Sequence, residues 1–173
     1  MIFIGVDPGR LGAVAWLDGE RRHIEVRDTP LAGEDYDYRG MVRILEEAAD
    51  DRMAVQVTIE ETIHVPHMAQ GRRFLPASDK TLHMSLGAWL CACAAVGITR
   101  VRRVQPKAWK SRLLAGLANN PGIEALALEQ RFRDHPRIHE LVRGPRGGLK
   151  DGRVDAILLA EDARLLWRLT GGA

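Results

Sequence analysis

The first part of the chain is built from short apolar runs that end at turn-forming residues. The run before Asp7-Pro8-Gly9 and the run before Asp18-Gly19 are both short enough for strands, and Asp-Gly is a strong hairpin signal. Alternating apolar and polar positions, typical of a half-buried strand, follow in two further segments. The pattern therefore predicts strands over residues 2–6, 12–17, 22–27 and 54–60.

The rest of the chain shows mainly helical spacing. Met41, Ile44, Leu45 and Ala48 recur at helical intervals, Ser78 and Gly97 bracket a long apolar segment, and Pro106 suits the first turn of a helix. Helices are predicted over 38–50, 79–96, from 106 onward, over 121–131 and over 151–169. Residues 98–104 are predicted as a strand, residues 62–78 as a loop and residues 134–150 as irregular.

This order of elements predicts an α/β fold. Three consecutive strands joined by tight turns form an antiparallel meander, and two later strands return through helical crossovers as parallel neighbours. We expect a mixed five-stranded sheet flanked by helices on both faces. With 173 residues and no evident linker, the chain is predicted to form a single domain over 1–173.

Composition narrows the class of protein. Hydrophobic residues make up 46% of the chain, yet no apolar run reaches the roughly 18–20 residues that a membrane span needs. No signal peptide is visible, so we expect a cytoplasmic protein without membrane partners. The two cysteines, Cys91 and Cys93, are too few for a zinc site and lie on a predicted apolar helix, where both are expected in the core.

The net charge of +2 hides an uneven distribution. Residues 1–51 contain six arginines and twelve acidic residues, whereas residues 100–150 contain twelve lysines and arginines and four acidic residues. A basic segment of this kind is either a solvated face or a contact surface for a polyanion. Because arginine predominates and its planar fork matches phosphate, the pattern favours nucleic acid.

Four acidic residues are the candidate chemistry: Asp7, Glu60, Asp151 and Asp155. Asp7 and Glu60 end strands that we expect to be parallel neighbours, and Asp151 and Asp155 share one face of the last helix. Converging carboxylates would repel one another, and Mg²⁺ or Mn²⁺ is the usual counterion, with two ions suited to phosphodiester hydrolysis. The alternative is that these acids are turn residues or helix first-turn residues.

The segment Asp7-Pro8-Gly9-Arg10-Leu11-Gly12 admits a rival interpretation as the phosphate loop of an ATP-dependent enzyme. Sugar kinases and actin-like ATPases have a similar arrangement of aspartate and glycines. Those proteins need two such domains, and neither a second phosphate loop nor enough chain is present here. The pattern therefore favours a metal site.

Four ordered motifs resemble those of the RuvC family of Holliday-junction resolvases, including its phage relatives. They are Ile4-Gly5-Val6-Asp7-Pro8-Gly9 with Gly12-Ala13, Thr58-Ile59-Glu60, Val104-Gln105-Pro106-Lys107-Ala108-Trp109-Lys110, and Asp151-Gly152-Arg153-Val154-Asp155-Ala156-Ile157-Leu158-Leu159-Ala160. The resemblance implies a ribonuclease H-like fold, a homodimer, two metal ions per site and symmetric nicking of four-way junctions. It assigns catalysis to Asp7, Glu60, Asp155 and Lys110. The family commonly carries an acid or histidine where this chain has Gly152, so Asp151 is the nearest candidate for a fourth ligand.

Basic residues supply candidate DNA contacts. Lys107 and Lys110 share a helix face, the segment around 62–80 offers basic side chains with one aromatic that could wedge an unstacked base, and the arginine- and glycine-rich segment before 151 reads as a flexible arm. The expected contacts are Lys107, Lys110, Arg72, Arg73, Phe74, Lys80, Arg143, Arg146 and Lys150. His64 and His67 lack the further ligands of a zinc site, and Glu61 is expected on the opposite strand face from Glu60.

These features favour a metal-dependent endonuclease that resolves branched DNA, of phage or prophage origin in a bacterial host. Two alternatives stay open. Another ribonuclease H-type nuclease would act on RNA or an RNA–DNA hybrid, and a catalytically silent module would bind nucleic acid without cutting it. The apolar helix with Trp89 and Leu90 is either buried within the fold or forms the seam of a homodimer.

Overall fold

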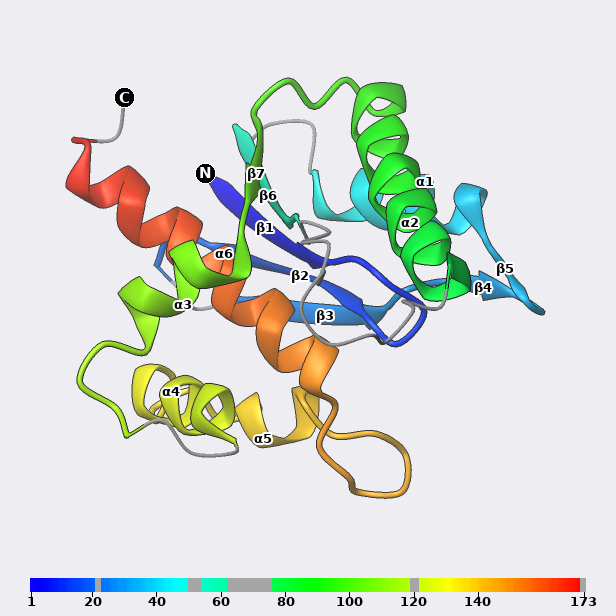
Figure 1. Ribbon diagram of the computed structural model, residues 1–173. Coiled ribbons are helices and arrows are strands. Elements are labelled where there is room, and N and C mark those ends of the chain that lie inside the picture. The colour runs from blue at the N-terminus through cyan, green and yellow to red at the C-terminus, as the bar shows by residue number, and fades with distance from the viewer. Residues whose placement is uncertain (21–22, 50–53, 62–75, 119–121, 172–173) are drawn as a thin grey trace, which may run out of the picture.

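The computed structural model describes residues 1–20, 23–49, 54–61, 76–118 and 122–171 (Figure 1). Its strands are β1 (Ile2–Asp7), β2 (Ala13–Asp18), β3 (Ile24–Asp28), β4 (Leu31–Ala32), β5 (Asp35–Tyr36), β6 (Val55–Glu60) and β7 (Val101–Val104). Its helices are α1 (Tyr38–Ala48), α2 (Pro76–Ala95), α3 (Pro106–Leu113), α4 (Ile123–Arg131), α5 (Ile138–Leu141) and α6 (Asp151–Leu169).

The main sheet has five strands in the order β3-β2-β1-β6-β7. β1, β2 and β3 pair antiparallel, and β1 with β6 and β6 with β7 pair parallel. The predicted mixed sheet is therefore confirmed. β4 and β5 form a separate two-stranded sheet that the sequence pattern does not indicate, because two-residue strands are too short to show alternation.

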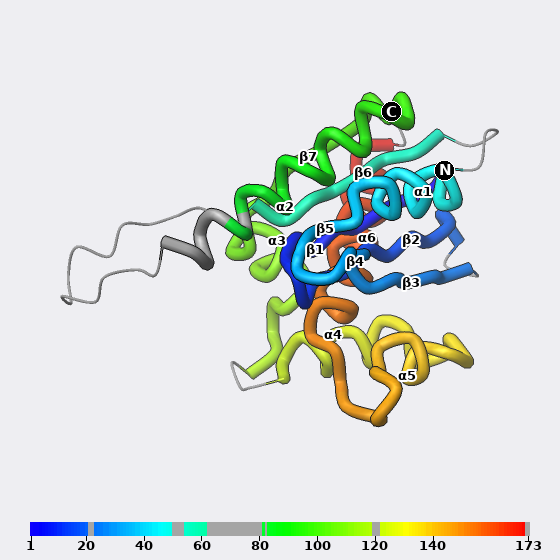
Figure 2. Tube along the Cα trace, turned by 90° about the vertical axis from the view of Figure 1, so that its right-hand side faces the viewer, coloured from blue at the N-terminus to red at the C-terminus, as the bar shows by residue number. Residues whose placement is uncertain are grey.

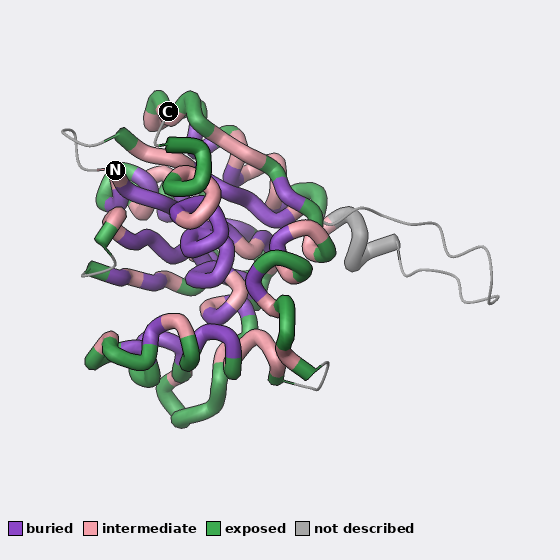
Figure 3. The backbone as a smooth tube through the Cα atoms, turned by 90° about the vertical axis from the view of Figure 1, so that its left-hand side faces the viewer, coloured by how far each residue is buried: buried purple, intermediate pink, exposed green. Residues whose placement is uncertain are grey.

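Helices cover both faces of this sheet. Successive side chains of a strand point to opposite faces, so Phe3 packs with α6 whereas Ile4 packs with α1 and α2. In Figure 1, α6 crosses one side of the sheet while α1 and α2 lie together beyond its other side. Figure 2 shows α1 and α2 from another direction, and Figure 3 shows that burial is most continuous along the strands and the middle of α6. The core thus has two layers, one on each face.

Gly5 lets α6 lie directly against β1. A Cβ atom at this position would stand 2.1 Å from the carbonyl oxygen of Ala156, 2.5 Å from the amide nitrogen of Ala160 and 2.9 Å from Cβ of Leu159. Backbone atoms of a helix cannot move aside as the end of a flexible side chain can. Gly5, in the middle of β1, therefore sets how closely α6 lies against the sheet, near the edge where β1 ends.

Several sequence predictions differ from the structure at element boundaries. α2 begins at Pro76, so Ser78 lies inside the helix and is not its cap, and β7 is confined to four residues. Residues 134–150 contain the short helix α5 and a hairpin loop closed by a bridge between Arg143 and Leu149. Both features depend on packing and backbone hydrogen bonds rather than on periodicity.

The apolar helix α2 packs inside the fold through Trp89 and Cys93, which are buried against the sheet and α1. Cys91 is exposed, so its prediction as a core residue was wrong: two residues along a helix turn a side chain by about 200°. The homodimer stays a prediction. None of the helices within the described ranges is long and apolar enough to cross a membrane.

Candidate active site

Asp7 and Glu60 end adjacent parallel strands on the same face of the sheet. The register pairs Val6 with Ile59, which places the next residue of each strand side by side at the carboxyl edge. Strand alternation directs Asp7 and Glu60 toward α6, on the side where Phe3 and Thr58 also point. Glu61 follows and pairs with the exposed Arg103 at 3.2 Å. The two strand-end carboxylates thus meet where the sequence pattern predicts.

The N-terminal end of α6 brings Asp155 to the same edge. Asp155 is partly buried, with about 20% of its side chain exposed, whereas Asp151 at the start of the helix is exposed. Between them, Gly152 packs against the loop after β1: a Cβ atom there would stand 2.5 Å from the carbonyl oxygen of Leu11 and 3.0 Å from Oδ2 of Asp7. The position where the resemblance leads one to expect a ligand therefore has no room for a side chain.

The three shielded carboxylates have raised pKa values. Burial raises the pKa of Asp7 from 3.8 to about 8, the charges of Glu60 and Asp155 act in the same direction, and Lys110 opposes them. Burial likewise raises the pKa of Asp155 to about 6, against the charge of Lys110. The pKa of Glu60 is also raised by burial, although Trp109 and Lys110 oppose the shift. The site holds more negative charge than its surroundings compensate.

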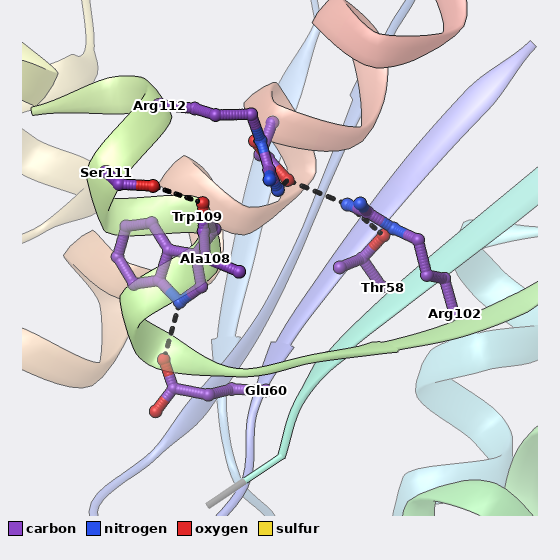
Figure 4. Close-up of polar contacts among 8 residues, drawn as sticks. Thr58, Glu60, Arg102, Ala108, Trp109, Ser111 and Arg112 are labelled. Carbon is purple, nitrogen blue, oxygen red and sulfur yellow. Dashed lines mark hydrogen bonds and ion pairs between the residues drawn. The ribbon is translucent and has the colours of Figure 1, made fainter. Parts of the chain in front are cut away.

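Trp109 orients Glu60. Its indole Nε1 donates a hydrogen bond of 2.7 Å to Oε2 of Glu60, and both side chains are buried (Figure 4). Trp109 lies on α3, which begins at Pro106 directly after β7. In the sequence, this tryptophan stands within one of the four motifs, and no pattern there indicates a role for it. Only the approach of α3 to the end of β6 reveals the contact.

An ion cluster about one turn further along α3 joins that helix to α6. Asp162 is buried and accepts hydrogen bonds of 2.7 Å from two nitrogens of Arg112 and one nitrogen of Arg102. Figure 4 shows both guanidinium groups converging from α3 and β7, with Thr58 as a further acceptor for Arg102. Because α3 also carries Trp109 and Lys110, the cluster helps to place both residues at the carboxylate edge.

Two hollows adjoin the carboxylates. One of about 870 Å³ runs along the loop Asp7–Gly12, past Thr81, to the start of α6 at Leu149–Gly152. The other, of about 250 Å³, is lined by Lys110, Glu124 and Asp155 among other residues. Asp151 and Leu149 border both. The loop itself is anchored to α2, because the amide of Gly9 donates to Oγ of the buried Ser85 at 3.0 Å. Neither Glu124 nor Ser85 stands in a sequence pattern that predicts a place at this site.

The predicted DNA-contacting basic residues differ in their exposure and in whether their charged groups already have a partner within the protein. Lys107 and Arg146 are exposed. Lys150 is engaged with Asp28, Nζ to Oδ2 at 3.1 Å, and Arg143 donates to the carbonyl of Gly147. Three of the predicted contacts, Arg72, Arg73 and Phe74, lie outside the described residues together with His64 and His67, and of Lys80 only the backbone in α2 is described.

The donor chemistry at the edge suits a divalent cation. Mg²⁺ and Mn²⁺ favour carboxylate oxygens, and a cation would stabilise the ionised carboxylates of Asp7, Glu60 and Asp155, whose pKa values are raised mainly by burial. Within the described ranges, however, no three acidic, histidine or cysteine side chains stand together in an arrangement that already encloses one ion. The residues fit the metal by their chemistry, and their side chains would have to adjust to close around it.

Replacing Trp109 with phenylalanine should remove the hydrogen bond to Glu60 and keep most of the ring. We expect a loss of about 1–3 kcal/mol of unfolding free energy, because the buried carboxylate loses its donor, and a further rise in the pKa of Glu60. Denaturant unfolding measures the loss. Trp89→Phe is the matched control, because Trp89 is equally buried and its Nε1 has no hydrogen-bond partner among the described residues. Equal losses in the two variants would show that the hydrogen bond contributes nothing.

No protein-family model matches the sequence, and no curated protein matches it significantly. Solved structures do match. RuvC of Thermus thermophilus in complex with a Holliday junction substrate is 16% identical with a TM-score of 0.64, and the match covers 100% of this chain and 98% of that one. A second structure of Thermus thermophilus RuvC is 19% identical with a TM-score of 0.61 and the same coverage.

The yeast mitochondrial Holliday junction resolvase Ydc2 is 15% identical with a TM-score of 0.58, over 97% of this chain and 80% of that one. Each match spans 97–100% of this chain, and so includes its mixed five-stranded sheet and the helices on both faces. At these identities the likeness concerns the path of the backbone. The chain therefore has the ribonuclease H-like fold of the RuvC-type Holliday junction resolvases.

Proposed function

We propose that this protein is a divalent-metal-dependent endonuclease that cuts four-way or otherwise branched DNA. The observation that carries the proposal is the convergence of Asp7, Glu60 and Asp155, from β1, β6 and α6, at one edge of a sheet with this fold. Among the proteins of the same fold, Thermus thermophilus RuvC is in complex with a Holliday junction substrate, and the yeast protein is a mitochondrial Holliday junction resolvase by name. A raised pKa at all three carboxylates supports a site built to receive cations.

In this proposal Asp7, Glu60 and Asp155 hold the metal ions, and the exposed Asp151 is a candidate for a fourth ligand. When bound, Mg²⁺ or Mn²⁺ supplies the positive charge that draws the scissile phosphate into the site and stabilises the charge that develops on it. Trp109 keeps Glu60 turned toward the site. Lys110 adds a second positive charge beside Asp155, where it can face a phosphate oxygen.

Contacts outside the reacting group would come from exposed basic residues. Lys107 follows β7 on the same helix as Lys110, and Arg146 stands on the hairpin loop that precedes α6. Such side chains bind phosphate without reading sequence, so the protein should recognise the shape of a junction more than its bases. Arg72, Arg73, Phe74 and Lys80 remain predicted contacts of the same kind.

The test is cleavage of a labelled four-way DNA junction, a matched duplex and an RNA–DNA hybrid, each with Mg²⁺ and with Mn²⁺. We expect paired symmetric nicks in the junction only, and no cleavage by Asp155→Asn. Cutting of the hybrid instead would move the substrate to RNA and contradict the proposed specificity. Tight binding of the junction without cutting under either metal would contradict the enzyme and leave a nucleic-acid-binding module.

A further inference from the structure

The ammonium group of Lys110 lies between two carboxylates that come from different helices. Its Nζ donates a hydrogen bond of 2.9 Å to Oε1 of Glu124, in the first turn of α4, and stands 3.6 Å from Oδ2 of Asp155 on α6. The contact with Glu124 is within hydrogen-bond distance, and the contact with Asp155 is longer. Lys110 is thus held closer to Glu124 than to the carboxylates of the candidate active site.

The position of Glu124 is set by the fold. Gly122, with φ of +84°, is the N-cap of α4. Ala127 and Leu128 on that helix are buried, Leu128 in the core that α4 shares with α6. The side chains of Glu124 and Lys110 are only 27% and 32% exposed, so their ion pair is partly withdrawn from water and is stronger than a surface pair. Both residues border the hollow of about 250 Å³ that also contains Asp155.

A lysine beside a carboxylate cluster competes with a metal ion. An ammonium group free to move would bind Asp155 directly, because that carboxylate and its neighbours lack sufficient positive charge. It would then occupy oxygens that a divalent cation needs. An anchor that draws the ammonium away by a short distance leaves those oxygens available and still keeps the positive charge within reach of a phosphate.

We propose that Glu124 is a positioning residue: it holds Lys110 beside Asp155 without letting it pair fully with the carboxylates, so that the site stays open to a divalent cation. This inference rests on the proposed function for the identity of the cation, and on the two distances from Lys110 for the placement. Glu124 itself touches neither substrate nor metal. Its effect passes through Lys110.

The test is Mg²⁺ binding measured by calorimetry on the DNA-free protein, and the half-saturating Mg²⁺ concentration for junction cleavage. Glu124→Gln should raise both the dissociation constant for Mg²⁺ and the half-saturating Mg²⁺ concentration by roughly threefold to tenfold. The affinity for the junction should stay unchanged. Glu129→Gln is the control. Glu129 lies on the same helix, but its side chain is 57% exposed and its ion pair, with His139, is long at 3.9 Å. With Lys110→Gln already in place, Glu124→Gln should have no further effect.

Unchanged Mg²⁺ binding by Glu124→Gln, or an equal effect in the Lys110→Gln background, would overturn the inference. The NMR signal of the Lys110 ammonium group in the metal-free protein gives an independent readout: it should shift in Glu124→Gln and stay in place in Glu129→Gln. The calorimetry and the NMR measurement need no DNA. A wild-type protein that binds Mg²⁺ but cuts no junction would therefore refute the proposed function and still decide the role of Glu124.

Discussion

Asparagine in place of Asp7 should abolish DNA cleavage and, at the same time, stabilise the metal-free protein. Cleavage should fall by roughly a thousandfold or more, since the variant loses a carboxylate that the proposed metal ions require. The free energy of unfolding of the metal-free protein should rise, because an ionised Asp7 destabilises the folded state. Burial is the main cause, and the charges of Glu60 and Asp155 add to it. Asparagine keeps the shape of the side chain without that charge.

The sign of the pH dependence follows from the pKa of Asp7, which is about 8 in the folded protein against 3.8 ordinarily. Between these values the folded state holds a proton that the unfolded state has released, so wild-type stability declines as pH rises through this window. Asp7→Asn should show a smaller decline. At pH 8 it should exceed the wild type by a free energy on the order of 3 kcal/mol.

Urea unfolding in EDTA at pH 5 and pH 8 measures this difference. Asp151→Asn is the matched control, because Asp151 is exposed and its neutralisation should change stability little. Adding Mg²⁺ should then raise the free energy of unfolding of the wild type more than that of Asp7→Asn, because the wild type binds the ion more tightly. A variant that is less stable than the wild type at pH 8 in EDTA would show that the carboxyl group is not under electrostatic strain.

Alanine in place of Gly5 should strongly destabilise the protein, by about 3 kcal/mol or more. The added methyl group would meet the backbone of α6 at Ala156 and Ala160, at distances of 2.1 and 2.5 Å. Since neither contact can be relieved by a side-chain rotation, α6 would have to move away from β1. Asp155 would move with it, so cleavage should fall even at temperatures where the variant stays folded.

Thermal and denaturant unfolding of Gly5→Ala, beside Gly87→Ala, checks this prediction. Gly87 lies within α2, and a Cβ atom there would meet nothing within 4 Å. Alanine is the better helix former, so Gly87→Ala should gain up to about 1 kcal/mol. Opposite signs for the same chemical change would confirm that the close approach of α6 to β1 is the cause. Wild-type stability of Gly5→Ala would contradict that packing.

The strand pattern was sufficient to predict the sheet and two of its carboxylates. Apolar runs ending at Asp7-Pro8-Gly9 and at Glu60 mark strand ends, and parallel neighbours must end at the same edge. The spacing of Asp151 and Asp155 places both on one helix face. These features depend on local periodicity and on the geometry of adjacent strands, which a sequence carries directly. The segment over 151–169 is also a helix with those limits in the structure.

Tertiary structure decided which residues complete the site. Trp109, Glu124 and Asp162 contact groups that lie 49, 14 and 50 or more positions away along the chain, and no periodicity indicates such pairs. The structure also separates Asp151 from Asp155, which helical spacing alone places on one face: one turn of helix takes a side chain from the exposed rim to the shielded edge. The physical reason is that strand and helix order follow from each segment's own pattern of burial, whereas shielding, charge compensation and hydrogen-bond partners depend on which segments pack together.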